Sequence, residues 1–431
     1  MKSLLSLVLL AFLFSVQLNS YAQTCTNKNR VYANAQSFER NVNFLSIGTN
    51  TDGPNAADND PFSKSNLYLQ AILGADITQY LEFRESNKIT RKQISGPNTI
   101  YVKLALPATF LNAGGAIEVG TFSYNGNIPV QTQKYNGTTV VGLIGGPGTV
   151  EIPIRLNAGE QSNGVYVKLV GGILSIPIST DVYGAYILED TNQIPDCDKG
   201  IDVISGLSDN SILPVGSAFG SISGESNAID ARPFTSYASI SAGVNVANSA
   251  YLTAVFARPS VAGDSAKIII ENLGDGFNIF SGLGVQTYLG ANGTGNTITA
   301  TNIVSRPVPG YPNLRELSFP VNSSFDRVRI SYGGLIGISG SLRIYDVKKV
   351  IPKPIPIIDG LISDSKNVCF GASPSLSISN IQDCTTYSWY ENETSTTPLK
   401  IGQIFQPGIL SVGEHVFYVQ SKRDNCLSLC I

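Results

Sequence analysis

Charged residues are scarce in this sequence. Asp, Glu, Lys and Arg supply 14% of its 431 residues and give a formal net charge of −3, whereas an average soluble domain has about a quarter. No cluster of Lys and Arg is long enough to neutralise several phosphates, and prolines interrupt the densest basic stretch at 348–353. The sequence therefore argues against nucleic acid as a partner.

Histidine is also scarce, since His415 is the only one. A catalytic Ser or Cys needs a base beside it, and we expect His415 on a solvent-facing strand. No Gly-x-Ser-x-Gly elbow occurs, and the cysteine spacing matches no zinc motif. Paired carboxylates meet in space rather than along the chain, so the sequence leaves glycoside hydrolysis open. On balance we predict a protein without catalytic activity.

Helical patterns are missing as well. We find no capped run of apolar residues at i, i+3, i+4 and i+7. Apolar and polar residues alternate instead in the short segments 99–106, 151–156, 164–169 and 327–331. In the first of these, Ile100, Val102 and Leu104 point one way, and Tyr101 and Lys103 point the other. A period of two with one polar face indicates half-buried antiparallel strands, so we predict an all-β fold of tandem β-sandwiches.

Long apolar runs are confined to the N-terminus. Lys2 precedes the apolar run 4–14, and Ser20 and Ala22 are small residues at the positions that signal peptidases require. The run is too short to cross the ~30 Å of a bilayer core, so residues 1–22 are predicted to be a signal peptide rather than an anchor. No later run is long enough to span a membrane, so we expect no transmembrane segment in the mature chain and a secreted or outer-surface location.

The sequence repeats itself. Residues 55–63 (Asn-Ala-Ala-Asp-Asn-Asp-Pro-Phe-Ser) recur at 227–235 as Asn-Ala-Ile-Asp-Ala-Arg-Pro-Phe-Thr. Tyr80-Leu81 has a counterpart in Tyr251-Leu252 at nearly the same offset. Ordered matches of this kind argue for duplication of a whole domain. We predict two jelly-roll-like sandwiches, a proline-rich linker and a third module, with the bounds 23–198, 199–349, 350–357 and 358–431.

The repeated segment is the best site candidate. In its structural interpretation, Asp58 and Asp230 close Asx turns, proline fixes φ, and phenylalanine starts a buried strand. In its functional interpretation, the two Asp residues bind calcium, because carboxylates and loop carbonyls are hard oxygen ligands. Calcium is the one cofactor that the sequence suggests. The segment also faintly resembles the first loop of discoidin-like, galactose-binding sandwiches, although those place Gly after the Asp, where Asn59 and Ala231 stand here.

Six cysteines indicate an oxidising compartment. Cys25 and Cys197 bracket the first predicted sandwich, and we expect them to form a disulfide. Closing so long a loop would stabilise the fold by ~4–5 kcal/mol in the chain-entropy model. The remaining cysteines lie near the C-terminus, at 369, 384, 426 and 430, and their pairing is left open by the residues alone.

The C-terminal module resembles a known family. Its order is Cys369-Phe370-Gly371, an apolar strand, Tyr387-Ser388-Trp389-Tyr390, and a Tyr-Val strand that leads to Cys426 and Ser428. This order resembles the Ig-like modules of secreted and surface proteins of Bacteroidetes, which include adhesin-like proteins associated with type IX secretion. The resemblance implies an Ig-like sandwich with a disulfide between Cys369 and Cys426, although Cys384 and Cys430 depart from the simple pattern.

Trp389 is the only tryptophan and lies on an alternating strand beside Tyr387. Such a residue is more often the core of a sandwich than a ligand platform, so we expect it to be buried against Tyr387, Leu376, and Val416 or Phe417. The chain stops soon after Cys426, where an Ig-like sandwich needs a further edge strand. We therefore expect this module to be partial.

Three functions of different classes fit these observations. The leading hypothesis is a cell-surface or secreted adhesin-like protein, whose stacked sandwiches hold a binding tip away from the cell. The alternative is a glycan-binding accessory protein for polysaccharide capture, which needs an exposed aromatic platform or a polar groove in a duplicated sandwich. The third is an enzyme whose catalytic domain lies elsewhere. The expected partner is an extracellular glycan or surface protein, and the sequence does not indicate an oligomeric state.

Overall fold

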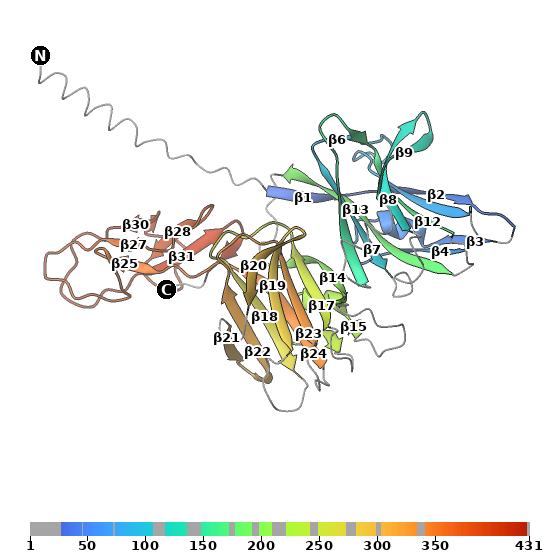
Figure 1. Ribbon diagram of the computed structural model, residues 1–431. Coiled ribbons are helices and arrows are strands. Elements are labelled where there is room, and N and C mark those ends of the chain that lie inside the picture. The colour runs from blue at the N-terminus through green and yellow to red at the C-terminus, as the bar shows by residue number, and fades with distance from the viewer. Residues whose placement is uncertain are drawn as a thin grey trace, which may run out of the picture. The chain divides into compact units, whose positions relative to one another are not determined.

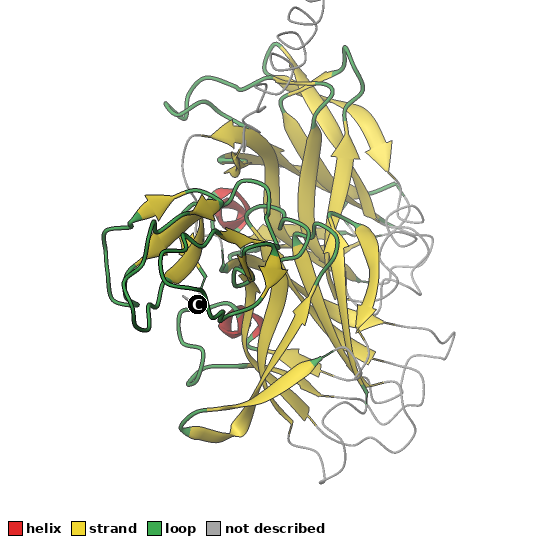
Figure 2. Cartoon of the chain, turned by 90° about the vertical axis from the view of Figure 1, so that its left-hand side faces the viewer, coloured by secondary structure: helices red, strands yellow, loops and turns green. Residues whose placement is uncertain are grey.

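The computed structural model describes residues 27–44, 46–71, 74–106, 117–135, 148–171, 177–191, 198–208, 221–241, 249–272, 282–298, 303–333 and 341–428 (Figure 1). Strands dominate these residues, and the only helical segments among them are the two short 3₁₀ turns η1 (Gly53–Ala57) and η3 (Glu225–Ala228) (Figure 2). The all-β prediction is confirmed. The predicted signal peptide lies outside the described residues, and within them no helix has the length and apolar character needed to cross a membrane.

The first sandwich consists of two main sheets. One has the strand order β3 (Ile47–Thr51), β4 (Ser65–Gln70), β13 (Ile178–Thr191), β7 (Thr99–Leu106) and β10 (Gly148–Arg155), and β1 (Asn27–Tyr32) also pairs with β13. The other has the order β2 (Ala35–Asn41), β5 (Asp76–Glu82), β12 (Gly164–Val170), β8 (Ile117–Asn125) and β9 (Ile128–Tyr135). A small ribbon pairs β6 (Ile94–Ser95) with β11 (Gln161–Ser162).

The second sandwich repeats this arrangement. Its first sheet has the order β15 (Ser221–Ser223), β16 (Ala238–Ser241), β24 (Ser341–Val350), β18 (Ser265–Asn272) and β22 (Tyr311–Pro320), and β21 (Val304–Val308) adds a strand beyond β22. Its second sheet has the order β14 (Gly200–Ser208), β17 (Ser249–Phe256), β23 (Arg327–Gly333), β19 (Leu283–Leu289) and β20 (Asn292–Ile298). The five strands of each main sheet of the first sandwich have counterparts in the same order in the second, whereas β1, β6, β11 and β21 have none.

A β-bulge marks the same point in both sandwiches. Between β7 and β13 the register steps from Val182 to Gly184, so that Tyr183 has no partner across the ladder. Between β18 and β24 it steps past Tyr345 in the same way. A bulge changes the direction of the side chain that it carries. In both sandwiches this side chain is a tyrosine, Tyr183 in the first and Tyr345 in the second. A shared irregularity of this kind supports duplication more strongly than a shared strand order alone.

One of the matched pairs from the sequence is not structurally equivalent. Phe83 donates its N–H to the carbonyl of Asn163, and Phe256 donates its N–H to the carbonyl of Asp326 at the same corner of the second sandwich. Aligning these two corners places Tyr80 opposite Thr253 rather than Tyr251. The tyrosine match arises because both strands alternate, and a shift of two residues leaves an alternating pattern unchanged.

The two sandwiches lie in one compact unit, which comprises Lys28–Pro352 and Asp424–Ser428. Edge strand β10 of the first pairs with β14 of the second at Gly148 and Gly206, which joins a sheet of each sandwich into one of eleven strands. Gly148 has a φ of +144°, and a Cβ there would lie 2.3 Å from the Cα of Gly206. Only glycine allows the two edges to come this close.

Each sandwich has its own apolar core. The predicted inward residues of β7, Ile100, Val102 and Leu104, are fully buried in the first core. The second core is built in the same way, with Ile268 and Ile270 of β18 fully buried. Burial of each such side chain contributes about 1.5–3 kcal/mol, so these inward rows supply the main driving force for folding.

The C-terminal module has two small sheets. One has the order β26 (Leu361–Ile362), β25 (Pro356–Ile358), β27 (Leu376–Ile378) and β30 (Ile404–Phe405), and the other has the order β29 (Lys400–Ile401), β28 (Thr386–Tyr390), β31 (Tyr418–Arg423) and β32 (Cys426–Leu427). Trp389 is buried between them with Tyr387 and Leu376, and Phe417 packs against this cluster. The indole N–H donates to the carbonyl of Gly402 at 3.0 Å. The predicted core position of Trp389 is confirmed, with Phe417 rather than the exposed Val416 beside it.

Candidate functional site

A buried ionic network lies on the outer face of β7 and β10, where the sequence predicted a half-exposed polar face. Asp202 of β14 accepts hydrogen bonds from Arg30 at 2.9 Å and from Lys103 at 2.5 Å. None of the three side chains is more than 6% exposed. Because Asp202 belongs to the second sandwich and both cations belong to the first, this carboxylate links the two sandwiches.

Glu151 of β10 is the second buried acid of the network. It accepts hydrogen bonds from Arg327 of the second sandwich and from the hydroxyl of Tyr186. The guanidinium of Arg30 lies 4.0 Å from the centre of the Tyr186 ring. Burial, together with the neighbouring carboxylate of Glu151, holds the pKa of Tyr186 well above its ordinary value, so the hydroxyl stays protonated and donates. Nε of Arg327 is buried without a hydrogen-bond partner, and the other contacts join the two sandwiches through buried ion pairs.

The repeated segment forms an Asx turn in the first sandwich. Oδ1 of Asp58 accepts the N–H of Asp60 at 2.9 Å. Oδ2 of the same carboxylate accepts the hydroxyl of Ser63 at 2.6 Å. These are the hydrogen bonds of the structural interpretation, in which an aspartate side chain closes the turn ahead of a strand.

Asp230 does the same in the second sandwich. Its Oδ1 accepts the N–H of Arg232 at 2.8 Å, and its Oδ2 accepts the hydroxyl of Ser236 at 2.6 Å. Burial acts to raise the pKa of Asp230, but the hydrogen bonds from Ser236 and Arg232 and the Arg232 charge outweigh it, and the pKa lies below its ordinary value. The ionised carboxylate is therefore the form that the folded turn prefers.

Calcium binding at Asp58 and Asp230 stays a prediction. Among the described residues, no three side chains of His, Cys, Asp or Glu gather closely enough to hold a metal ion. A calcium site at either aspartate would therefore have to rely on backbone carbonyls and water for its other ligands. The hypothesis predicts heat on titration of the whole chain with calcium, and loss of that heat in Asp58→Asn and Asp230→Asn. Without such heat, the turn is the whole role of both residues.

A pocket opens on the outer face of the first sheet of the second sandwich. Its volume is about 180 Å³. Phe234, from the repeated segment, and Tyr311, at the start of β22, stack at its mouth with ring centres 4.7 Å apart and planes 19° apart. The two residues are 36% and 39% exposed. The two parallel rings expose apolar aromatic surface beside the pocket.

Glu271 supplies the charge of this pocket. Its Oε2 accepts the hydroxyl of Tyr345 at 2.8 Å and an N–H of Arg343 at 2.9 Å. Burial, and then the hydrogen bond to Glu271, raise the pKa of Tyr345, which keeps its hydroxyl a donor. Both hydrogen bonds fall on one oxygen, so Oε1 remains an open acceptor. Asn313, also in the lining, adds an amide that both donates and accepts.

The corresponding place in the first sandwich is filled. Phe62 stands where Phe234 stands in the repeat, and Tyr183 is the bulged tyrosine that matches Tyr345. The ammonium of Lys103 lies 5.4 Å from the Phe62 ring centre and 4.8 Å from that of Tyr183. It also donates to the carbonyl of Pro61 at 2.8 Å. A side chain of the chain itself thus occupies the space that is open in the second sandwich.

The sequence indicated only part of this pocket. It selected the repeated segment, but it predicted that the phenylalanine starts a buried strand. That prediction is wrong, because the next strands begin only at Ser65 and Ala238 and both phenylalanines remain about one-third exposed. Glu271 and Tyr345 were missed, since they come from strands far apart in sequence. The sole signal for them is the bulge, which becomes visible only when two strands are paired.

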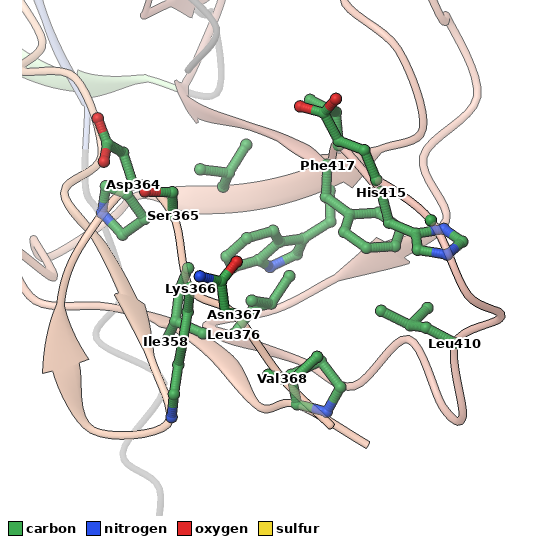
Figure 3. Close-up of a pocket in the computed structure, with 17 residues that line it drawn as sticks. Ile358, Asp364, Ser365, Lys366, Asn367, Val368, Leu376, Leu410, His415 and Phe417 are labelled. Atoms are coloured by element: carbon green, nitrogen blue, oxygen red, sulfur yellow. The ribbon is translucent and has the colours of Figure 1, made fainter. Parts of the chain in front are cut away.

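A larger pocket of about 700 Å³ lies in the C-terminal module (Figure 3). Its floor is apolar and includes Leu376 and Trp389. Lys366 lines one side and His415 another (Figure 3). Lys366 is paired with Asp359 at 2.7 Å, and Trp389 is buried, so the pocket presents a gap in the core packing more than a set of converging polar groups.

His415 lies in this module but has no catalytic arrangement. It is exposed and lies outside any strand, whereas the sequence placed it on one. Its Nε2 lies 3.0 Å from the carbonyl oxygen of Ser411 and 3.3 Å from the hydroxyl of the same residue. A carbonyl oxygen only accepts, so the 3.0 Å contact is a hydrogen bond in the tautomer that carries its hydrogen on Nε2.

The predicted disulfide between Cys369 and Cys426 is wrong. Cys369 is a free, exposed thiol, whereas Cys426 is disulfide-bonded, as is Cys384. Cys369 lies in an exposed segment before β27, whereas Cys426 begins β32 in the other sheet, so the two residues belong to different sheets of the module. Cys25 and Cys197 lie outside the described residues, and their pairing stays a prediction.

These features define a modular all-β protein, in which two duplicated sandwiches precede a smaller sandwich. Residues 359–430 match the family model of an Ig-like domain described as CHU_C associated, so the C-terminal module is Ig-like, as its resemblance implied. No curated protein matches the chain.

Among solved structures, the chain is similar to a fucolectin from striped bass (Morone saxatilis) serum, with 12% identity, 74% of this chain and 95% of the other covered, and a TM-score of 0.23. It is similar to the adhesin domain of Epf from Streptococcus pyogenes, with 12% identity, 56% and 96% coverage, and a TM-score of 0.25. It is also similar to the CBM32-1 and CBM32-2 domains of ZmpB from Clostridium perfringens, with 8% identity, 78% and 97% coverage, and a TM-score of 0.21.

Proposed function

We propose that this chain is an exported, adhesin-like protein that binds glycans through the second sandwich and has no catalytic role. The observation that carries the proposal is the exposed Phe234–Tyr311 pair beside the Glu271 pocket. A sugar ring has an apolar C–H face and a rim of hydroxyls. Flat aromatic rings can cover the C–H face of the sugar. A carboxylate accepts hydrogen bonds from the sugar hydroxyls, and an amide both accepts and donates them.

The link between the sandwiches supports a spacer role beside the binding role. Asp202 and Glu151 each receive cations or hydroxyls from across the sandwich boundary, and the whole set is buried. Removing one partner of a buried pair is costly, because a charge is left unpaired. Such a link holds the second sandwich in a defined orientation, which suits a protein that presents a binding face at a distance from its attachment point.

Export is supported by the predicted signal peptide at 1–22, by the use of cysteine, and by the Ig-like match at 359–430. At least Cys384 and Cys426 are disulfide-bonded, and disulfides persist mainly in extracytoplasmic compartments. We therefore propose a secreted or outer-surface location. The resemblance to Bacteroidetes surface proteins suggests type IX secretion as the route.

A glycan array probed with the whole chain, with and without calcium, tests the proposed function. We expect binding to a restricted set of glycans, and we expect Tyr311→Ala to abolish it. Phe44→Ala is a matched control, because Phe44 is 94% exposed on the first sandwich and far from the pocket in sequence and sheet. If no glycan binds, or if Tyr311→Ala binds as well as the unmodified chain, the proposal is wrong.

A further inference from the structure

We infer that the pocket beside Phe234 takes a single neutral sugar ring and rejects acidic sugars. This inference rests on the proposed glycan-binding function and specifies its ligand class. The residues that line the pocket include one acid, Glu271, and no Lys, Arg or His. A uronic or sialic acid would therefore bring a second carboxylate to a site that holds one already and offers it no cation.

The hydrogen-bonding state of Glu271 favours a hydroxyl as its next partner. Its Oε2 already accepts from Tyr345 and Arg343, so Oε1 is the atom that faces a ligand. A carboxylate oxygen only accepts, and a sugar hydroxyl donates. Hydrogen bonds to an ionised acceptor are about twice as strong as neutral ones, so this single oxygen provides orientation as well as affinity.

Arg343 does not supply the missing cation. It does not line the pocket, and its guanidinium is held between the carboxylate of Glu271, at 2.9 Å, and the ring of Tyr237, whose centre is 4.5 Å away. The charge of Arg343 is thus already paired with that acid, and the hydrogen bond to Glu271 raises the pKa of Arg343. An incoming carboxylate would have to break this pair.

The dimensions of the pocket limit the ligand to one ring. Its volume of about 180 Å³ lies below the ~300–1,000 Å³ of pockets that enclose drug-sized ligands. The nearly parallel rings of Phe234 and Tyr311 extend the apolar surface at its mouth, where the face of a pyranose can lie. The rest of a longer glycan would then project into solvent.

In the first sandwich, the position equivalent to the pocket beside Phe234 is filled by a side chain of the protein itself. Lys103 places its ammonium between the equivalent phenylalanine and tyrosine, and the residue in the same register in the second sandwich is the buried Ile269. The second sandwich therefore has no cation at this place. Among the described residues that line the open space, Glu271 is the one that carries a charge.

Calorimetric titration of the whole chain with two matched pairs of sugars tests this inference. The pairs are galactose with galacturonate and glucose with glucuronate, which differ only in the carboxylate. We expect at least one neutral sugar to bind tenfold or more tightly than its acid. In Glu271→Gln, which keeps an acceptor but removes the charge, we expect that ratio to shrink several-fold while the melting temperature shows that the chain remains folded.

The outcomes separate the two proposals. If an acidic sugar binds as tightly as its neutral partner, or if Glu271→Gln leaves the ratio unchanged, the inference is wrong while glycan binding stands. If none of the four sugars binds and the glycan array also shows nothing, both proposals fail. If none of the four binds but the array shows neutral glycans bound and acidic ones not bound, the charge preference is supported and the ring is a different neutral sugar.

Discussion

Lys103 and Ile269 occupy the same register position in the two duplicated sandwiches, each across the ladder from the residue that follows a bulged tyrosine. The change from lysine to isoleucine gives the equivalent outer faces of the two sandwiches different roles. The lysine reaches Asp202 of the neighbouring sandwich and becomes part of a buried link. The isoleucine packs with Leu314 and Tyr345 and leaves the space above it to a pocket. The first sandwich thus uses this face for a contact, whereas the second leaves it open.

Lys103→Met should destabilise the first two sandwiches by about 3 kcal/mol, the lower end of the range for breaking a buried pair, because Asp202 keeps Arg30 as a partner. Denaturant unfolding measures the loss. Lys64→Met is the matched control, since Lys64 pairs with Asp181 at 2.6 Å but is 50% exposed, and exposed pairs contribute about 1 kcal/mol or less. Equal losses in the two variants would show that the buried link is no stronger than a surface ion pair.

Trp389→Ala should lower the free energy of unfolding of the Ig-like module by about 3–5 kcal/mol, as large-to-small aromatic changes in cores do, and leave glycan binding by the second sandwich intact. Calorimetry resolves the transition of this module. Phe370→Ala is the control, because Phe370 belongs to the same module and is 80% exposed. A loss of glycan binding in Trp389→Ala with no change in melting temperature would mean that the tryptophan is a ligand platform after all.

The sequence predicted those parts of the fold that depend on local pattern. Alternation identified the inward row of Ile100, Val102 and Leu104, and the repeated segment identified the duplication. It could not predict that Lys103, on the polar side of the same strand, is buried, because the neighbour that covers it belongs to another sandwich. For the same reason Glu271 and Tyr345 were missed. Their proximity depends on strand pairing and a bulge, and neither leaves a mark in a single strand.

The stability contributed by Asp230 should depend on pH. Its pKa is lower in the folded chain than the ordinary value of 3.8, so the contribution is present above that value and is lost as the pH falls through the folded pKa. Asp230→Asn keeps an oxygen acceptor for the turn but removes the charge. We expect it to be about 1 kcal/mol less stable at pH 7, with the difference closing in acid. Melting temperatures measured across this range would contradict the account if the gap stayed constant.

The cysteines should react in two groups. Alkylation of the denatured chain without reductant should label Cys369, the free and exposed thiol, and spare Cys384 and Cys426. Peptide mapping by mass spectrometry should also find Cys25 joined to Cys197. Labelling of both Cys25 and Cys197 would show that the first sandwich lacks the predicted disulfide, whereas labelling of Cys426 would contradict its place in a disulfide.

The most direct test of glycan recognition by the second sandwich is the affinity of the best glycan from the array for three forms of the chain. We predict that Phe234→Ala weakens binding at least tenfold, because the stacked pair loses half of its apolar surface. Phe62→Ala, the same change at the same place in the first sandwich, should leave the affinity within about twofold, since Lys103 occupies that site. Equal weakening by the two substitutions, or none by Phe234→Ala, would contradict the assignment of the site.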